Sequence, residues 1–149
     1  MSLFDMLGVS ASALSAERQR AEVTSANLAN AETTHTDSGG PFVRKQVVFS
    51  SAAGSPFPSF LNAAIRSGRA PAGAVQVTKV VEDTTPPVRR YEPGNPDADK
   101  DGYVSYPAIN PVTEMVDLMD ASRAYQLNAS AATAAKQMIQ ESIDILKSS

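Results

Sequence analysis

The sequence predicts a mainly α-helical protein with a small β-rich insert, in which long helices form the two ends of the chain. Three observations lead to this fold class. All 10 prolines of the 149-residue chain lie between Pro41 and Pro111, so both ends are free of helix breakers. The C-terminal end repeats apolar or small residues in a heptad-like pattern, and short strand-like segments occur only in the middle. We therefore expect the terminal helices to pair as a coiled-coil-like arm, with a β module between them.

This pattern divides the chain into three expected parts. Residues 1–34 hold the N-terminal helix and residues 110–149 the C-terminal helix of one helical domain. Residues 35–109 form the β-rich middle module. Within the module, residues 51–73 are rich in Ser, Ala, Gly and Pro, which predicts a mobile loop.

The N-terminal helix is predicted from Ser2 to Ala31, a stretch without proline whose only glycine is Gly8. Glu17 interrupts its apolar seam, so a coiled coil is less clearly indicated here than a helix. The seam consists of apolar or small residues seven positions apart, which are Leu7, Leu14, Ala21 and Leu28.

Four short segments of the middle part have strand character. They are residues 42–49, 74–81, 88–91 and 103–106. A cluster of turn-forming residues between His35 and Pro41 separates the first helix from these strands.

The C-terminal helix is predicted to start with Asn110 as its N-cap and Pro111 as its first residue, and to reach Lys147. Such a helix would be roughly 55 Å long. Its stripe steps alternately by three and four residues, with Lys136 as the one violation. The stripe comprises Met115, Leu118, Ser122, Tyr125, Ala129, Ala132, Ile139, Ile143 and Leu146. Packing on the chain's own core is the ordinary alternative explanation for either stripe.

Composition argues against several classes of partner. The net charge is −3 and basic doublets occur only at Arg44-Lys45 and Arg89-Arg90, so nucleic acid is not expected as a partner. Cysteine is absent, which excludes disulfides and thiolate metal sites. No apolar stretch is long enough to insert into a membrane, and no Lys or Arg precedes Arg18, so no secretory signal is expected.

The acidic segment from Asp97 to Gly102 has the spacing of the start of a calcium-binding loop. The twelfth position of that loop needs a bidentate Glu, but Ala108 stands there, so we expect a structural turn and no metal or other cofactor. His35 is the only histidine, and no nucleophile motif or phosphate-binding loop is present. The protein is therefore not expected to be an enzyme.

Two terminal segments carry a family resemblance. Residues 25–34 (SANLANAETT) resemble the N-terminal signature of flagellar rod and hook proteins, with Asn27 and Asn30 able to hydrogen-bond across a close helix contact. Residues 114–128 resemble the C-terminal signature of the same family. Residues 44–49 and 91–107 are similar to the proximal-rod members in particular. The chain departs from the family pattern at Glu32, His35, Ala108 and Pro111.

The resemblance implies a structural subunit of the bacterial flagellar basal-body rod. Such a subunit assembles with copies of itself and with other rod proteins, near the inner-membrane ring and the export apparatus. It would leave the cytoplasm through the flagellar type III system without a cleaved signal, and would transmit torque and surround the export channel within the periplasm.

Together with the helical stripes, the resemblance places the assembly interface on both terminal helices. Its expected members are Leu7, Leu14, Ala21, Asn27, Leu28, Asn30, Met115, Leu118, Ser122, Tyr125, Ala129, Ala132, Ile139 and Ile143. Two other hypotheses remain open from the sequence: another axial subunit of the same machine, or a small calcium-responsive adaptor with amphipathic helices.

Overall fold

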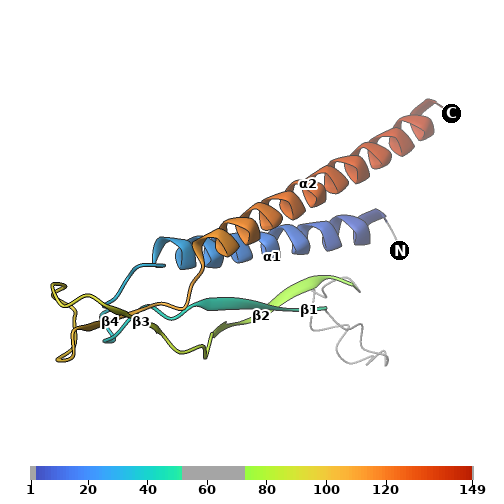
Figure 1. Cartoon of the computed structure of the whole chain (residues 1–149). Helices are drawn as coiled ribbons and strands as arrows, with labels where there is room; N and C mark the ends of the chain where they lie inside the picture. The colour runs from blue at the N-terminus through green and yellow to red at the C-terminus, as the bar shows by residue number, and fades with distance from the viewer. Residues whose placement is uncertain (1–2, 52–72, 149) are drawn as a thin grey trace, which may run out of the picture. The chain divides into compact units, whose positions relative to one another are not determined.

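The computed structural model describes residues 3–51 and 73–148, which form two long helices joined through short strands (Figure 1). The elements in chain order are α1 (Leu3–Ala29), β1 (Lys45–Ser51), β2 (Val75–Glu82), β3 (Val88–Tyr91), β4 (Tyr103–Tyr106) and α2 (Pro111–Ser148). The predicted fold class, long terminal helices around a small β-rich insert, is confirmed. The predicted mobile loop at residues 51–73 lies outside the described residues, apart from its two end positions.

The end of α1 is shaped by polar side chains, and the bond of the Asn30 amide lies within α1 rather than across a helix contact as the signature suggested. Asn30 donates its side-chain amide to the carbonyl of Ala26 at 2.9 Å, and the Thr33 hydroxyl donates to Asn30 Oδ1 at 3.2 Å. The Asn30 backbone N–H still bonds to Ala26 at 3.1 Å, but the next backbone bonds span only three residues, so regular helix ends at Ala29, two residues before the predicted end.

The start of α2 agrees with the predicted cap. Asn110 Oδ1 accepts a hydrogen bond from the backbone N–H of Val112 at 3.0 Å, and Pro111 is the first helical residue. The Asn110 carbonyl also accepts from the Glu114 N–H at 3.1 Å, the first bond of the helix itself. Within the described residues, neither helix is long and apolar enough to cross a membrane.

The chain divides into two compact units, and each helix contributes one end to each unit. The first comprises Met1–Arg18, Phe49–Thr78 and Ser122–Ser149, and the second comprises Gln19–Val48 and Lys79–Ala121. The three parts predicted from the sequence are bounded by helices and strands, whereas these two units are defined by compactness. The three-part division therefore stays a prediction.

The first unit packs through small side chains. Ala16 of α1, Ala74 before β2 and Ala135 of α2 are all buried. The Ser12 hydroxyl accepts from the backbone N–H of Val75 at 3.1 Å, which ties α1 to the first residue of β2. Small buried residues allow close approach of helices and strands in this unit.

The second unit contains an antiparallel hairpin of β3 and β4, whose register pairs Val88 with Tyr106 and Tyr91 with Tyr103. Gly102 ends the long turn between the strands with a φ of +81°, and a Cβ at that position would lie 2.9 Å from Tyr91 Cε2. Glycine is therefore required there for backbone conformation and for space. The hairpin buries Val104 completely.

The acidic segment forms the turn of this hairpin. Asp99 Oδ1 accepts from the backbone N–H groups of Asp101 and Tyr103, both at 2.9 Å, and its other oxygen pairs with Arg89. These bonds, the one from Tyr103 foremost, lower the pKa of Asp99. No group of three or more His, Cys, Asp or Glu side chains is placed to hold a metal in the part of the chain that the structure describes. The predicted absence of a calcium site awaits a binding measurement.

Candidate functional site

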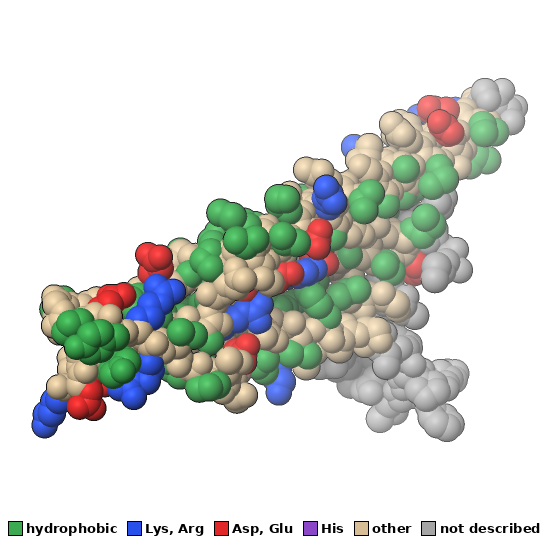
Figure 2. Space-filling view, in the orientation of Figure 1, with side chains coloured by type: hydrophobic (Ala, Val, Ile, Leu, Met, Phe, Trp, Pro, Cys, Tyr) green, Lys and Arg blue, Asp and Glu red, His purple; other side chains and the backbone are tan. Residues whose placement is uncertain are grey.

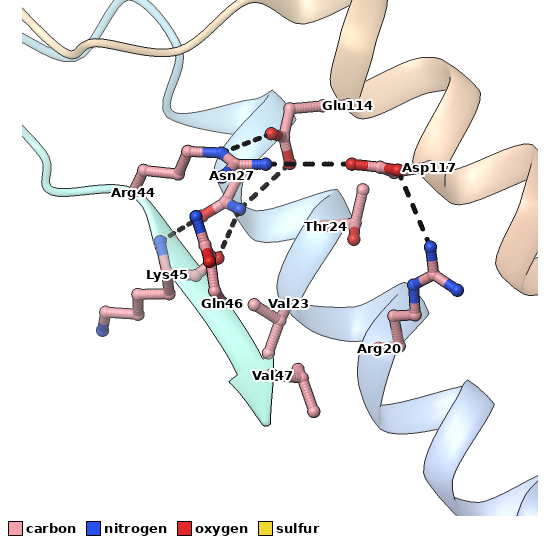
Figure 3. Close-up of a pocket in the computed structure, with 10 residues that line it drawn as sticks. All are labelled: Arg20, Val23, Thr24, Asn27, Arg44, Lys45, Gln46, Val47, Glu114 and Asp117. Carbon is pink, nitrogen blue, oxygen red and sulfur yellow. Dashed lines mark hydrogen bonds and ion pairs between the residues drawn. The ribbon is translucent and has the colours of Figure 1, made fainter. Parts of the chain in front are cut away.

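Three side chains from separate stretches of the second unit meet in a buried polar cluster (Figure 3). The polar cluster consists of Asn27 from α1, Arg44 from the segment before β1, and Glu114 from the first turns of α2. Asn27 and Glu114 are each only 1% exposed, so their polar groups depend on protein partners rather than water.

Asn27 connects α1 to the start of β1. Its side-chain amide donates to the carbonyl of Lys45 at 2.8 Å, and its Oδ1 accepts from the Lys45 backbone N–H at 2.9 Å. The same amide donates to Glu114 Oε2 at 3.0 Å. The side-chain amide nitrogen and the oxygen of Asn27 are thus both hydrogen-bonded. Asn27 pairs with the backbone N–H and carbonyl of Lys45 as a neighbouring strand would.

Arg44 compensates the buried carboxylate of Glu114. Its Nε donates to Glu114 Oε1 at 2.7 Å, and its terminal nitrogens lie 3.6 Å from Asp83 and 3.7 Å from Asp117. Burial lowers the pKa of Arg44, but the hydrogen bond to Glu114 and the nearby carboxylates outweigh it, so the net pKa is raised. Arg44 therefore stays charged. At the rim, Arg20 of α1 lies 3.6 Å from Asp117 of α2.

A cavity of about 200 Å³ adjoins the polar cluster. Its lining side chains include Val23, Thr24 and Val47 besides the charged groups already described. Four of the lining groups, Asn27, Arg44, Glu114 and Asp117, are joined to one another by hydrogen bonds and ion pairs. The arrangement can hold three chain segments in one geometry, which is a structural task.

The predicted interface residues differ in how exposed they are in the single chain. Asn27 is buried in the polar cluster. The half-buried members are Leu7, Leu14, Ala21, Leu28, Asn30, Leu118, Ala129, Ala132 and Ile139. The exposed members are Met115, Ser122, Tyr125 and Ile143. Whether they contact other subunits stays a prediction.

The most buried positions of α2 run beside the predicted stripe. Glu114, Ala121 and Ala135 are buried, each one residue before a stripe position. Because a helix turns about 100° per residue, Ala121 lies close to the stripe positions Leu118 and Tyr125 around the helix, so the face that this chain buries overlaps one edge of the predicted stripe. Lys136, the violation in the stripe, is exposed. Arg44 and Glu114 lie in segments that resemble the family, but the sequence predicted no role for either. A pattern of apolar residues cannot identify a charged residue that is buried.

An exposed apolar surface lies on the outer side of α2, where Figure 2 shows hydrophobic side chains along the helix. We call it the outer patch: Val112, Met115, Val116 and Met119, which are 67%, 54%, 51% and 57% exposed. Their spacing of three and four residues places them on one face. Contiguous exposed apolar side chains are typical of surfaces that bind another protein.

Known sequences match the chain at both ends and over its whole length. Residues 7–34 match the family model described as flagella basal body rod protein, and residues 100–145 match that of the flagellar basal body rod FlgEFG protein C-terminal region. The chain is 39% identical over 150 residues to the flagellar basal-body rod protein FlgC of Bacillus subtilis, covering 99% of this chain and 100% of the relative.

Two further relatives bear the same description. FlgC of Borreliella burgdorferi is 35% identical over 157 residues, with 99% of both chains covered. FlgC of Escherichia coli O157:H7 is 39% identical over 145 residues, with 97% of this chain and 98% of the relative covered. The long terminal helices and the structural role of the buried cluster agree with this similarity. The chain belongs to the FlgC family of flagellar basal-body rod proteins, which are structural proteins and not enzymes.

Proposed function

We propose that the protein assembles into the rod through its terminal helices, with copies of itself and other rod proteins as neighbours. The outer patch carries this proposal, because its large apolar side chains lie on the side of α2 away from buried Glu114 and Ala121 and are left exposed by the described part of the chain. The predicted interface residues on α1 and α2 supply further contacts. Helices packed in this way would form a coiled-coil-like inner layer, built from residues 1–34 and 110–149, with the module of residues 35–109 outside.

The proposed task is mechanical. Packed helices transmit torque along the rod and enclose the channel through which later subunits pass. The rod location of the family supports a place in the periplasm, near the inner-membrane ring and the export apparatus, and delivery by flagellar type III export without a cleaved signal. Stiffness of the subunit suits such a task, and the ion-paired polar cluster contributes to it by holding the end of α1, β1 and the start of α2 in one geometry.

Met119→Glu tests the proposal at the centre of the outer patch. The side chain is 57% exposed in the single chain, so a charge there should leave the unfolding midpoint of the purified protein nearly unchanged. In cells it should block rod assembly and abolish motility, because a charge would be buried between subunits without a partner.

The matched control is Thr113→Glu, an exposed polar position in the first turn of the same helix, where a negative charge favours the helix dipole. It should leave motility unchanged. Normal swimming of the Met119→Glu strain, with the variant present in purified basal bodies, would remove the outer patch from the assembly interface.

A further inference from the structure

Methionine sulfurs are the groups of this chain that oxidise most readily. The protein has five methionines, and it contains neither cysteine nor tryptophan to compete for an oxidant. Among the described methionines, Met115 and Met119 are the most exposed, at 54% and 57%, followed by Met138 at 42% and Met6 at 41%. An oxidant dissolved in water therefore reaches Met115 and Met119 most easily.

The positions of these two sulfurs direct their chemistry to one surface. Met115 and Met119 are four residues apart in α2, so they are neighbours on one face of the helix. They make up half of the outer patch, whose other members, Val112 and Val116, have no sulfur. A reaction at the two sulfurs therefore changes half of the side chains of the outer patch at once.

The reaction with a peroxide is a two-electron oxygen transfer. The sulfur lone pair attacks one oxygen of hydrogen peroxide, and the O–O bond breaks. The displaced hydroxide takes up the proton left on the transferred oxygen, so the products are a sulfoxide and water. The sulfur is oxidised and the peroxide is reduced. A flexible apolar side chain becomes a polar one, and sulfoxide reductases return it to methionine.

The fold should tolerate this change, whereas a covered outer patch should not. Both methionines lie on the side of α2 away from buried Glu114 and Ala121, so in the single chain a sulfoxide oxygen can bond to water. In a contact with another subunit the same oxygen would be buried. It would then need a hydrogen-bond donor, which an apolar contact does not offer.

We propose that Met115 and Met119 form an oxidation site, at which oxidants of the peroxide class convert the outer patch from an apolar to a polar surface before the subunit is assembled. Modification at this site leaves the fold of the free subunit intact and removes its ability to assemble. The loss of assembly rests on the proposed function, whereas the location of the site and the intact fold do not.

Hydrogen peroxide treatment of the purified full-length chain tests the site. A Met6→Leu, Met138→Leu background removes the other two described methionines. Peptide mapping by mass spectrometry then follows the oxidation of Met115 and Met119 in native protein and in urea. We expect the native rates to be within roughly threefold of the rates in urea, because more than half of each residue is exposed.

Two properties of the oxidised protein complete this test. It should keep the unfolding midpoint of the untreated protein, and it should elute earlier from a hydrophobic-interaction column because the outer patch has become polar. Adding Met115→Leu and Met119→Leu to the same background should abolish the change in elution. Stronger protection of either sulfur in native protein, a lowered unfolding midpoint or an unchanged elution would overturn the proposal.

The consequence for assembly is tested in cells with glutamine as an uncharged polar substitute for the sulfoxide. Glutamine and methionine have similar helix propensities, so Met115→Gln with Met119→Gln should keep the unfolding midpoint. We expect its incorporation into purified basal bodies to fall by roughly tenfold or more. The control, Met6→Gln with Met138→Gln, places the same substitutions outside the outer patch and should be incorporated normally.

The remaining outcomes separate this inference from the proposed function. Normal incorporation of the Met115→Gln, Met119→Gln subunit, when Met119→Glu blocks assembly, would overturn the inference and leave the proposed function standing. Normal incorporation of both would overturn the two together. Failure of the control pair as well would show that polarity anywhere on the helices blocks assembly, so that the outer patch is not a distinct site.

Discussion

At the residue scale, Asn27 is the side chain whose chemistry is most closely specified by its surroundings. It uses two donors and one acceptor at once, and only an amide of this length offers all three. A hydrophobic residue would fit the helix face but would leave the Lys45 backbone groups without partners. An acid would supply the acceptor and remove both donors.

Asn27→Asp isolates this requirement, because the two side chains have nearly the same size. An oxygen would then face the Lys45 carbonyl and the carboxylate of Glu114, where the amide now donates. We expect the free energy of unfolding at neutral pH to fall by about 3 kcal/mol. Urea unfolding followed by circular dichroism measures it.

Asn30→Asp is the control for the same change on the same helix. Asn30 is only half-buried and its amide bonds to a single carbonyl, that of Ala26. Its effect should stay below about 1 kcal/mol. Equal losses of unfolding free energy in the two variants would show that the polar cluster does not depend on the Asn27 amide.

At the element scale, local sequence was sufficient for the helices and for the two strands of one hairpin, although not for their pairing. The strands at residues 88–91 and 103–106 were predicted with the bounds that the structure has, because prolines, acidic residues and Gly102 confine the turn between them. The start of α2 followed from the Asn110 cap. These features depend on residues close together in the chain, which is why sequence reasoning reached them.

The polar cluster could not be predicted in the same way. Arg44 and Glu114 are 70 residues apart, and either one alone looks like an ordinary surface charge. The first strand was predicted to begin at residue 42, but it begins at Lys45, where pairing of the backbone with Asn27 also begins. The face of α2 that the chain buries includes Glu114, which a stripe drawn from apolar and small residues could not contain.

The hairpin of β3 and β4 should weaken in acid. Hydrogen bonds from Asn95 and Tyr106 lower the pKa of Glu92 below its ordinary value of 4.5, and backbone bonds lower that of Asp99 below 3.8. A carboxyl whose pKa is lowered by folding stabilises the fold above its ordinary pKa and loses that contribution as the pH falls through its folded value. We therefore expect stability to be constant near neutrality and to decline below about pH 4.

Tyrosine fluorescence during acid titration can follow this change, since the chain has four tyrosines and no tryptophan. Tyr106→Phe removes the 2.9 Å bond from the hydroxyl to Glu92, so its acid transition should begin at a higher pH. Glu82→Gln, at an exposed position at the end of β2, should leave the profile unchanged. An identical transition in Tyr106→Phe would show that the bond to Glu92 does not contribute to acid stability.

At the scale of the whole molecule, the two units place different demands on assembly. The second unit has the buried polar cluster and a paired hairpin of its own. The described part of the first unit has buried alanines but leaves most of α2 beyond Ala121 exposed or half-buried. Alanine-rich helices gain little order from propensity alone, so the far end of α2 is the part of the described chain that has most to gain from neighbouring subunits.

Ala129→Glu tests that dependence at the narrowest part of the predicted stripe. Ala129 is half-buried, and a neighbouring helix that packs against it would meet extra volume and a charge. Overpacking costs about 1–3 kcal/mol, and an unpaired buried charge costs several more. We expect the variant to be produced and exported but not incorporated, so that cells lack hooks and do not swim.

The control is Ala131→Glu, the same substitution two residues further on at an exposed position, which should be tolerated. If both strains swim normally, the predicted stripe does not form a contact between subunits; if both fail, the cause is added charge on this end of α2 rather than the packing of one face.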